Sequence, residues 1–598
     1  MTRYLGLLAE LLRESWRRYP FPTAAGLAAV VLATATTPAL ALALRHAVDG
    51  IVTADERAAA VGALAAAGIF ALDRYLRDAG EVYEKVLADQ LGAVHLRGRI
   101  ERTLAGLDRL DHLERTDLLD RVTALQGAGW RIGHAPWQAV HAVAGAVQLG
   151  LLLFLLGSQV DPWLVLLVGF AAVPLWFDQY GQRAVSRATM DTAEAFRLQR
   201  HLFNLATGPD GGKEIRVAGA GAEIARRQRA AWDEAIRGRY RARLRAAAWR
   251  LTGWTVFTAG FGAGLGLVVH RAANGQGTLG DVVLAMTVAV TLRDALQATL
   301  FGVQVTMEGR AGGEPLLWLR DYARRAARDR GAGQPPATLR DGLTISGVSF
   351  TYPGTGRPAL DRVSFRVPAG SVVAVVGEYG SGKTTLVKLL AKFYAPDHGR
   401  ILVDGQDLAG LDTGAWRARC SAAFQDFGRF HVRFGDAVGI GDLPHREDQD
   451  QLQEAVRAAD ADGLVAGLPD GFGTQLGRRF DGVELSEGQW QKTALARASM
   501  RREPLLFVLD EPTASLDAPS EHVIFERYLA RARDLAARTG AVTVIISHRF
   551  STVTGADRIL VLDQGRLVEE GTHRELLDAG GRYAAAYAIQ ATAYAHDV

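Results

Sequence analysis

A lysine and two threonines close a glycine-rich turn in the second half of this 598-residue chain. The turn, Gly-Glu-Tyr-Gly-Ser-Gly-Lys-Thr-Thr at residues 377–385, follows an apolar run of strand character and precedes a helix-like apolar segment. This is the G-x-x-x-x-G-K-[ST] phosphate loop in its usual context. Its glycines let backbone N–H groups turn toward an anion, and the new helix adds its positive dipole end. The chain is therefore predicted to bind a nucleoside triphosphate.

Two side chains of this loop have specific expected roles. Lys383 is expected to reach the β- and γ-phosphates, and the Thr384 hydroxyl to hold Mg²⁺. The competing interpretation is a glycine-rich turn with a chance lysine, and the flanking strand and helix argue against it. The residues of the loop expected to contact the nucleotide are Gly377, Glu378, Tyr379, Gly380, Ser381, Gly382, Lys383, Thr384 and Thr385.

Two adjacent acids end a second apolar run, at residues 505–511. A buried strand has no use for neighbouring carboxylates unless a cation or a reacting water is close. Asp510 suits a contact to Mg²⁺, and Glu511 suits the base that orients the attacking water. A helix-capping role is the alternative for either acid alone.

The sequence Leu-Ser-Glu-Gly-Gln at residues 485–489 resembles the signature loop of ATP-binding-cassette (ABC) proteins, which no other phosphate-loop class carries. The resemblance implies that Ser486, Gly488 and Gln489 contact nucleotide. It implies further roles for Tyr352 as the aromatic stacking on adenine, Gln425 as a glutamine contacting Mg²⁺, Asp517 in the loop bridging two nucleotide sites, and His548 as the γ-phosphate sensor. Catalysis would then rest on Glu511, His548, Lys383 and Gln425, and the metal on Thr384, Gln425 and Asp510.

The cassette pattern has two notable departures. Glu487 stands where the signature usually has glycine, which places a carboxylate near a loop that should approach phosphates. Arg478 stands where the family usually carries a glutamate that faces the membrane domain. Neither departure removes a catalytic group, but both bear on turnover and coupling.

Six apolar segments precede the cassette, and four of them are strong. A helix needs about 20 apolar residues to cross a hydrocarbon core of about 30 Å. A secretory signal is the alternative for the first segment, but its length and the segments that follow favour a membrane span. The predicted spans are residues 23–44, 58–72, 135–156, 163–177, 251–269 and 279–291.

Arginine is concentrated in the two long connections, residues 73–134 and 178–250, and is scarce in the short ones. Because positive residues stay on the cytoplasmic side, the N-terminus and the ATPase domain are predicted to be cytoplasmic. Within these connections, residues 112–120 and 212–217 resemble the two coupling helices that press on the cassettes of ABC exporters.

Composition argues against nucleic-acid binding and against a disulfide-stabilised fold. A formal net charge of +3 gives no basic field for nucleic acid, and no aromatic residues interleave with the arginines. The single cysteine, Cys420, excludes an intrachain disulfide framework. A mean hydropathy of +0.04 with 22% charged residues indicates one very apolar part and one ordinary soluble part.

The whole chain resembles an exporter-type ABC half-transporter. The expected fold is a six-helix transmembrane domain (1–310), a linker (311–340) and an α/β P-loop ATPase cassette (341–598). The resemblance implies ATP-driven export of a small or amphipathic compound, such as a drug, lipid, peptide or secondary metabolite, across a bacterial inner membrane. Import through an exporter-like fold and a membrane-bound sensor or regulatory ATPase remain alternatives.

A second half-transporter is implied as partner. In the family the phosphate loop and the signature loop that hold one ATP with Mg²⁺ come from different cassettes, so two composite sites require a dimer. Because this chain keeps Glu511, His548, Gln425 and Ser486, a homodimer is favoured over a heterodimer. The other expected partners are the lipid bilayer and a small-molecule substrate. Nucleic acid is not expected as a partner.

Overall fold

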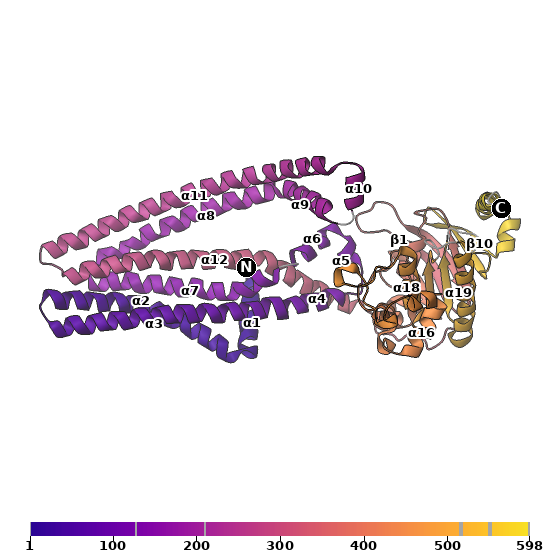
Figure 1. Cartoon of the computed structure of the whole chain (residues 1–598), viewed down its shortest axis with the longest axis horizontal. Coiled ribbons are helices and arrows are strands. Elements are labelled where there is room, and N and C mark those ends of the chain that lie inside the picture. Colours follow the sequence, from indigo (N-terminus) through magenta and orange to yellow (C-terminus); the bar gives the residue numbers. More distant parts are fainter. Residues whose placement is uncertain (1, 126–127, 209–210, 513–517, 548–552, 596–598) are drawn as a thin grey trace. The chain divides into compact units, whose positions relative to one another are not determined.

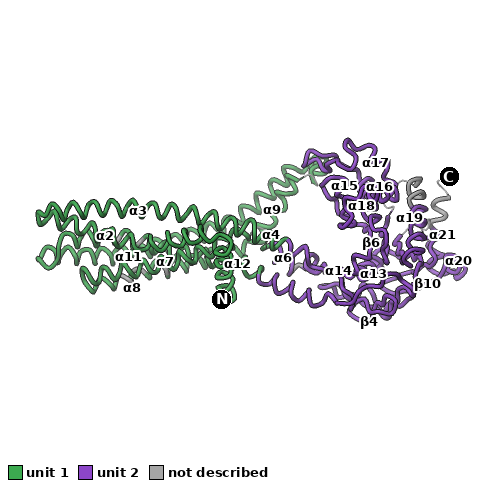
Figure 2. Tube along the Cα trace, turned by 90° about the horizontal axis from the view of Figure 1, so that it is seen from below, with its two compact units in different colours: residues 1–101, 124–316 green, residues 102–123, 317–598 purple. Residues whose placement is uncertain are grey.

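The computed structural model describes residues 2–125, 128–208, 211–512, 518–547 and 553–595. The chain forms two compact units (Figure 2), one of residues 1–101 and 124–316 and the other of residues 102–123 and 317–598. The expected domains placed residues 102–123 with the membrane helices, whereas here they pack with the cassette.

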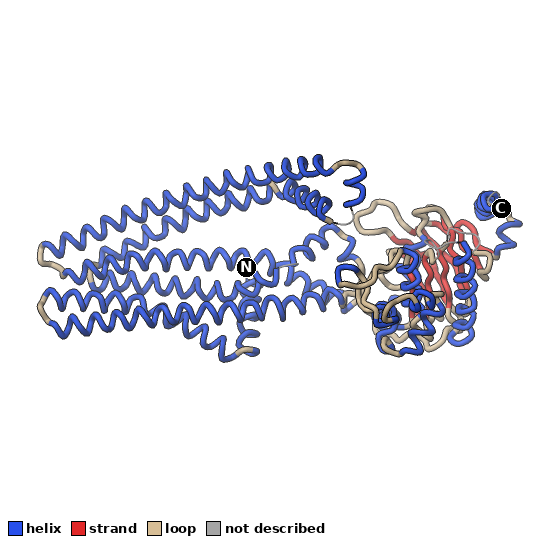
Figure 3. Tube along the Cα trace, viewed as in Figure 1, coloured by secondary structure: helices blue, strands red, loops and turns tan. Residues whose placement is uncertain are grey.

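The first unit is entirely helical (Figure 3), as far as it is described. Its six long helices are α2, α3, α7, α8, α11 and α12, with shorter α1, α4, α9 and α10 beside them. Their bounds are Thr2–Arg18 for α1, Pro20–Val52 for α2, Glu56–Asp89 for α3, Arg97–Ala105 for α4, Ala128–Gln159 for α7, Leu167–Asp191 for α8, Ala193–Thr207 for α9, Gly212–Val217 for α10, Gly221–Ala273 for α11 and Leu279–Arg328 for α12.

Length and apolar composition suit four helices of the described chain for crossing a membrane: Pro20–Val52, Glu56–Ala105, Gly129–Gln159 and Gly221–Ala273. Of the other two predicted spans, residues 279–291 lie within α12, whereas residues 163–177 begin in a short 3-10 helix, Pro162–Leu166, and continue into α8. Apolar side chains such as Phe70 and Phe154 point outward and are 62% and 72% exposed. Such exposure suits a hydrocarbon environment. Because several helices combine this exposure with sufficient length, the protein is a multi-pass membrane protein.

Small residues let these helices approach closely. A Cβ atom on Gly62 of α3 would lie 2.5 Å from the backbone nitrogen of Ala47 on α2. On α11, a Cβ atom on Gly253 would lie 2.9 Å from the Cα atom of Pro174 on α8. Close backbone contact at small residues is the usual way in which helices associate in a membrane, where the hydrophobic effect does not drive them together.

The described residues of the second unit form two sheets. A four-stranded antiparallel sheet has the order β2-β1-β4-β5, and a six-stranded sheet has the order β10-β9-β3-β8-β7-β6. Strands β9, β3, β8, β7 and β6 are parallel to one another, and β10 is antiparallel to β9. Their bounds are Leu343–Phe350 (β1), Leu360–Val367 (β2), Val372–Val376 (β3), His398–Val403 (β4), Gln406–Asp407 (β5), Cys420–Ala423 (β6), Leu506–Asp510 (β7), Val542–Ile546 (β8), Arg558–Asp563 (β9) and Arg566–Gly571 (β10).

The central strands are buried on both faces, which is why they read as continuous apolar runs. Alternate residues of β3 enter two different cores: Val373 and Val375 pack with the antiparallel sheet and α13 (Lys383–Leu390). Ala374 and Val376 pack toward the helical layer, including α15 (Phe434–Gly439) and α16 (Gln449–Ala458). The layer also contains α18 (Glu487–Ser499) and α19 (Ala518–Thr539).

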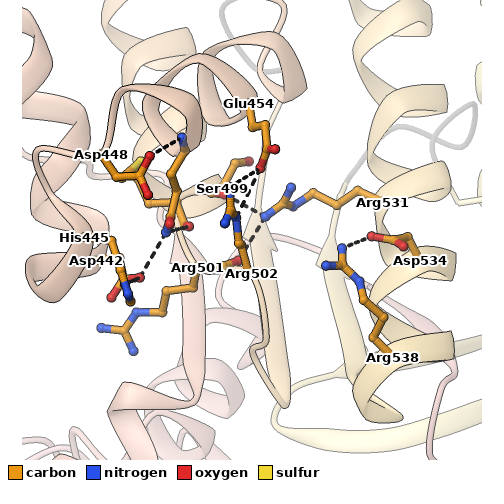
Figure 4. A network of polar contacts seen from close by, with 12 residues as sticks. Asp442, His445, Asp448, Glu454, Ser499, Arg501, Arg502, Arg531, Asp534 and Arg538 are labelled. Atoms are coloured by element: carbon orange, nitrogen blue, oxygen red, sulfur yellow. Dashed lines mark hydrogen bonds and ion pairs between the residues drawn. The ribbon is translucent and has the colours of Figure 1, made fainter.

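Polar contacts hold this helical layer together (Figure 4). Arg531 of α19 donates through Nη2 to the carbonyl oxygens of Ser499 (2.6 Å) and Arg501 (3.0 Å). Arg502 Nη2 lies 3.0 Å from a carboxylate oxygen of Glu454 on α16. Carbonyl groups at a helix end need such partners, and these contacts fix α18, whose N-terminus carries the signature sequence.

The remaining helices of this unit are short or peripheral. Their bounds are Asp111–Glu114 (α5), Thr116–Leu125 (α6), Thr413–Ala418 (α14), Asp462–Ala466 (α17), His573–Asp578 (α20) and Arg582–Ala595 (α21). Of these helices, Figure 1 labels α5 and α6.

Candidate nucleotide site

The phosphate loop joins the end of β3 to the start of α13, as the sequence predicts. Gly377, Gly380 and Gly382 adopt φ angles of 153°, 78° and 103°, a region that side chains with a Cβ atom rarely enter. A Cβ atom on Gly382 would also lie 2.5 Å from the carbonyl oxygen of Ala359. The sequence needs glycine here for backbone geometry.

Lys383 lies folded over its own loop. Its Nζ atom donates to the carbonyl oxygens of Gly377 and Glu378, each at 2.8 Å. Burial lowers the pKa of Lys383, an effect that the nearby carboxylates of Glu511 and Asp510 oppose. An ammonium group held so close to the loop is in place to exchange these carbonyl oxygens for phosphate oxygens.

The two acids at the end of β7 lie beside the loop because the carboxyl ends of parallel strands share one edge of the sheet. Thr384 Oγ1 donates to Asp510 Oδ2 at 3.3 Å. The other carboxylate oxygen of Asp510, Oδ1, is buried and has no hydrogen-bond partner among the described residues. Burial, with a further contribution from Glu511, raises the pKa of Asp510 to about 6.

These oxygens fit Mg²⁺. The metal prefers hard oxygen ligands and uses one or two carboxylates together with phosphates. The Thr384 hydroxyl, the buried Asp510 carboxylate with its unpaired oxygen, and the Gln425 side-chain amide supply such donors.

Glu511 has a strained backbone. Its φ angle is 49°, which is uncommon for a residue other than glycine and concentrates at functional sites. Gln425 Nε2 donates to Glu511 Oε2 at 2.9 Å, and Gln491 Nε2 of α18 donates to the Glu511 carbonyl oxygen at 3.2 Å. The structure thus brings Gln425 to the proposed base, and adds Gln491, which sequence reasoning missed.

Tyr352 packs against α13 at Thr385 and Lys388. Its hydroxyl group is 3.1 Å from Thr385 Oγ1, and its ring lies edge-on to that of Tyr394 with centroids 5.5 Å apart. Lys388 Nζ is 5.4 Å from the centre of the Tyr352 ring. The predicted stacking on adenine therefore involves an aromatic ring that neighbouring side chains already hold in place.

The segment of residues 102–123 supplies partners that the sequence did not reveal. Glu114 of α5 accepts a hydrogen bond from the Tyr394 hydroxyl and pairs with Lys388 Nζ at 3.1 Å. The hydrogen bond to Glu114 and, above all, burial raise the pKa of Tyr394. Asp108 pairs with Arg330 at 2.5 Å. The resemblance of residues 112–120 to a coupling helix predicted contact with the cassette, but not that Glu114 would meet Lys388 and Tyr394.

The signature sequence starts α18. Ser486 Oγ accepts from the Gln489 backbone N–H (3.3 Å), and Gln489 Oε1 accepts from the Ser486 N–H (2.8 Å), which is a capping box. These side chains therefore orient the first turn, where Gly488 lies. A helix N-terminus favours anions.

Glu487 points toward a cation. Its Oε2 atom lies 2.5 Å from Arg429 Nη2, and both side chains are about half exposed. The unusual signature carboxylate is thus neutralised by a side chain four residues after Gln425. Arg478 is exposed, and its backbone N–H donates to Glu484.

Two of the predicted site residues lie in segments that the structure does not describe. Asp517 and His548 lie outside the described residues, so their predicted roles remain predictions. Tyr379 is fully exposed at the tip of the loop, and Ser381 is buried beneath it.

Removing the charge of Asp510 is expected to stabilise the nucleotide- and metal-free protein. The unfolded pKa is about 3.9, and burial raises the folded value to about 6. Ionisation in the folded state therefore costs stability as pH rises from about 4 to 6. Asp510→Asn should raise the melting temperature at pH 8 in EDTA by a few degrees, and by less at pH 5. An equal change at both pH values would contradict this electrostatic account.

The fold and the site define an ATP-binding cassette. A sequence profile described as "ABC transporter" matches residues 360–514, which include the phosphate loop and both acids. A solved bacterial Atm1-family ABC exporter with ATP bound is similar over 96% of this chain and 99% of its own, with a TM-score of 0.74 and 26% identity. Residues 360–514 are thus an ABC transporter ATPase domain, and the chain shares with that solved exporter the organisation of an exporter-type half-transporter, with a membrane domain fused to one cassette.

Curated relatives are similar in sequence to part of the chain. The ATP-dependent lipid A-core flippase of Burkholderia orbicola (strain AU 1054) is 38% identical over 324 residues, 54% of this chain and 52% of that protein. The flippase of the same name from Chromobacterium violaceum is 38% identical over 322 residues, with the same shares. The chain spans about half the length of the curated relatives it matches.

Proposed function

We propose that two copies of this chain form an ATP-driven exporter of a small or amphipathic compound in a bacterial inner membrane. The observation that carries this proposal is the grouping at the phosphate loop of Thr384 with Asp510 and of Gln425 with Glu511. Similarity to a solved ABC exporter over nearly the whole chain supports it. The relatives named as lipid A-core flippases favour an amphipathic substrate, although their similarity covers only part of each chain.

The proposed chemistry assigns one task to each group. Lys383 binds phosphate oxygens by charge-assisted hydrogen bonds, and Glu511 orients and polarises the attacking water. Mg²⁺, held by Thr384, Asp510 and Gln425, would neutralise charge on the phosphates. Gln425 holds Glu511 through its amide until nucleotide and metal compete for both side chains.

The dimer follows from the separation of tasks between loops. In this proposal each ATP lies between the phosphate loop of one copy and the signature turn at Ser486 of the other. Binding of ATP stabilises one arrangement of the membrane helices, and hydrolysis releases it, because a ligand shifts an equilibrium by its unequal affinity for two states. His548 and Asp517 complete this proposal from the family resemblance.

A direct test is ATP-dependent accumulation of a labelled compound by inside-out vesicles that contain the purified chain. The compound would come from a panel ranked by stimulation of ATPase activity. Accumulation that requires ATP and is absent with Glu511→Gln is the expected result. Loss of preloaded compound from the same vesicles upon ATP addition would instead show import.

The Arg429–Glu487 pair leads to a second prediction. If Arg429 neutralises the signature carboxylate, Arg429→Ala should raise the KM for ATP about two- to five-fold, the range for an exposed ion pair. The double variant Arg429→Ala/Glu487→Gly should return KM close to the wild-type value, because it removes the repulsive charge as well. Arg446→Ala, which breaks the exposed pair with Glu447, is the matched control. Equal KM values for the single and double variants would refute this pairing role.

A further inference from the structure

Charged side chains lie between α2, α3 and α7, which run side by side (Figures 1 and 2). Gly62 of α3 contacts Ala47 of α2, and Gly80 contacts Ala29. This antiparallel register places residues 73–84 of α3 beside residues 25–36 of α2, which belong to its apolar span. The polar residues of this part of α3 therefore lie beside the apolar span of α2, although they follow the span predicted at residues 58–72.

The part of this region nearer the middle of the α2 span is a closed polar network. Asp73 accepts hydrogen bonds from Thr36 Oγ1 (2.5 Å) and Arg77 Nε (2.8 Å). Arg77 Nη2 donates to Thr37 Oγ1 at 3.3 Å, and Gln148 Nε2 of α7 donates to the same oxygen at 2.8 Å. Arg77 is thus already paired with a carboxylate.

A second group lies about two turns further along α3. Glu84 accepts from Gln138 Nε2 at 2.7 Å, and its other carboxylate oxygen lies 2.6 Å from His141 Nε2. The Glu84 side chain is 11% exposed and that of His141 is 36% exposed. Carboxylates in membrane helices are costly and mark functional sites by default.

A cavity of about 270 Å³ joins the two groups. One wall is apolar and the other polar. The apolar wall includes Ala29, Val30, Ala33, Leu76 and Ala144, and the polar wall Arg77, Glu81, Glu84, His141 and Gln148.

The charges of the cavity select a ligand of positive charge. Of the residues that line it, Glu81 and Glu84 are acids and Arg77 is the one arginine or lysine, with its charge balanced by Asp73. We propose that this cavity binds the protonated amine of an amphipathic cation, with the ammonium group at Glu84 and the alkyl part along α2. As a transport site, it rests on the proposed export function.

The test uses the full chain in lipid nanodiscs without nucleotide. Binding of radiolabelled dodecylamine is measured after subtraction of empty nanodiscs, with dodecanoate and dodecanol as competitors of equal chain length. We expect saturable binding that neither competitor displaces. Glu84→Gln should weaken binding about tenfold or more, since it deletes a charge-assisted contact. Glu56→Gln, in the first turn of α3 and away from the cavity, is the matched control and should bind as the wild type does.

Two results would overturn the proposal: unchanged amine binding by Glu84→Gln, or displacement by dodecanoate as strong as by unlabelled amine. If Glu84→Gln does not fold, Glu81→Gln replaces it. We then expect at least a threefold loss of affinity for the amine, and an unchanged affinity would overturn the proposal. Magnesium-dependent ATPase activity of the same samples is the separate readout. Hydrolysis without amine binding refutes the cavity site alone, and amine binding without hydrolysis supports the site but refutes ATP-driven export.

Discussion

Replacing Glu511 with glutamine is expected to lower steady-state ATP hydrolysis by about 10²–10⁴-fold, the usual contribution of a general base. Glutamine keeps the size of the side chain and its place beside Gln425, so the site should still fold and bind ATP. The strained backbone at Glu511 and its hydrogen bond to Gln425 show that the structure fixes this side chain. Hydrolysis is measured by phosphate release, and affinity by equilibrium binding of labelled ATP.

The control for this variant is Glu503→Gln. Glu503 is an exposed acid of the same cassette that lies 3.9 Å from Arg419. The Glu503→Gln variant should hydrolyse ATP at the wild-type rate. Wild-type turnover in Glu511→Gln would remove Glu511 from the mechanism, and loss of ATP binding in that variant would point to a structural role.

Replacing Lys383 with alanine is expected to weaken ATP binding itself by about 10–100-fold, because a hydrogen bond to a charged group contributes about 1.5–3 kcal/mol. Two loop carbonyl groups also lose their partner, so a melting curve must show that the cassette still folds. Lys383→Met keeps the aliphatic stem and should lose as much affinity as Lys383→Ala. If Lys383→Met bound ATP as tightly as the wild type, the ammonium group would not be a phosphate ligand.

The catalytic edge of the cassette was predictable because local sequence determines it. Continuous apolar runs predict strands buried on both faces, and parallel strands bring their carboxyl ends to one edge. The motif at residues 377–385 and the acids at 510 and 511 therefore had to be neighbours. The structure confirms the fold class, an ABC exporter architecture with helices before the cassette.

Contacts between distant segments could not be predicted in this way. Glu487 raised the expectation of a repulsive charge, but nothing in its neighbourhood along the chain identified Arg429 as its partner. Glu114 meets Lys388 and Tyr394 across more than 270 residues of sequence. Such pairs depend on how elements pack, which a single sequence does not reveal.

The second apolar span shows a different limit. The pattern of hydrophobic residues stops at Leu72, before Asp73, whereas α3 continues to Asp89 beside the apolar part of α2. Asp73 and Arg77 can occupy this position because Thr36, Thr37 and each other satisfy their polar groups. Paired charges inside a helix bundle are invisible to hydropathy, and they are the residues that suggest a binding cavity.

In the proposed function, a homodimer of this chain alone couples ATP hydrolysis to membrane transport. The most direct measurement is magnesium-dependent ATPase activity of the purified chain in nanodiscs that hold two copies, with Glu511→Gln as the inactive reference. We expect hydrolysis that requires Mg²⁺ and disappears in the variant. A folded dimer that binds ATP but hydrolyses none, or does so only after a different half-transporter is added, would contradict it.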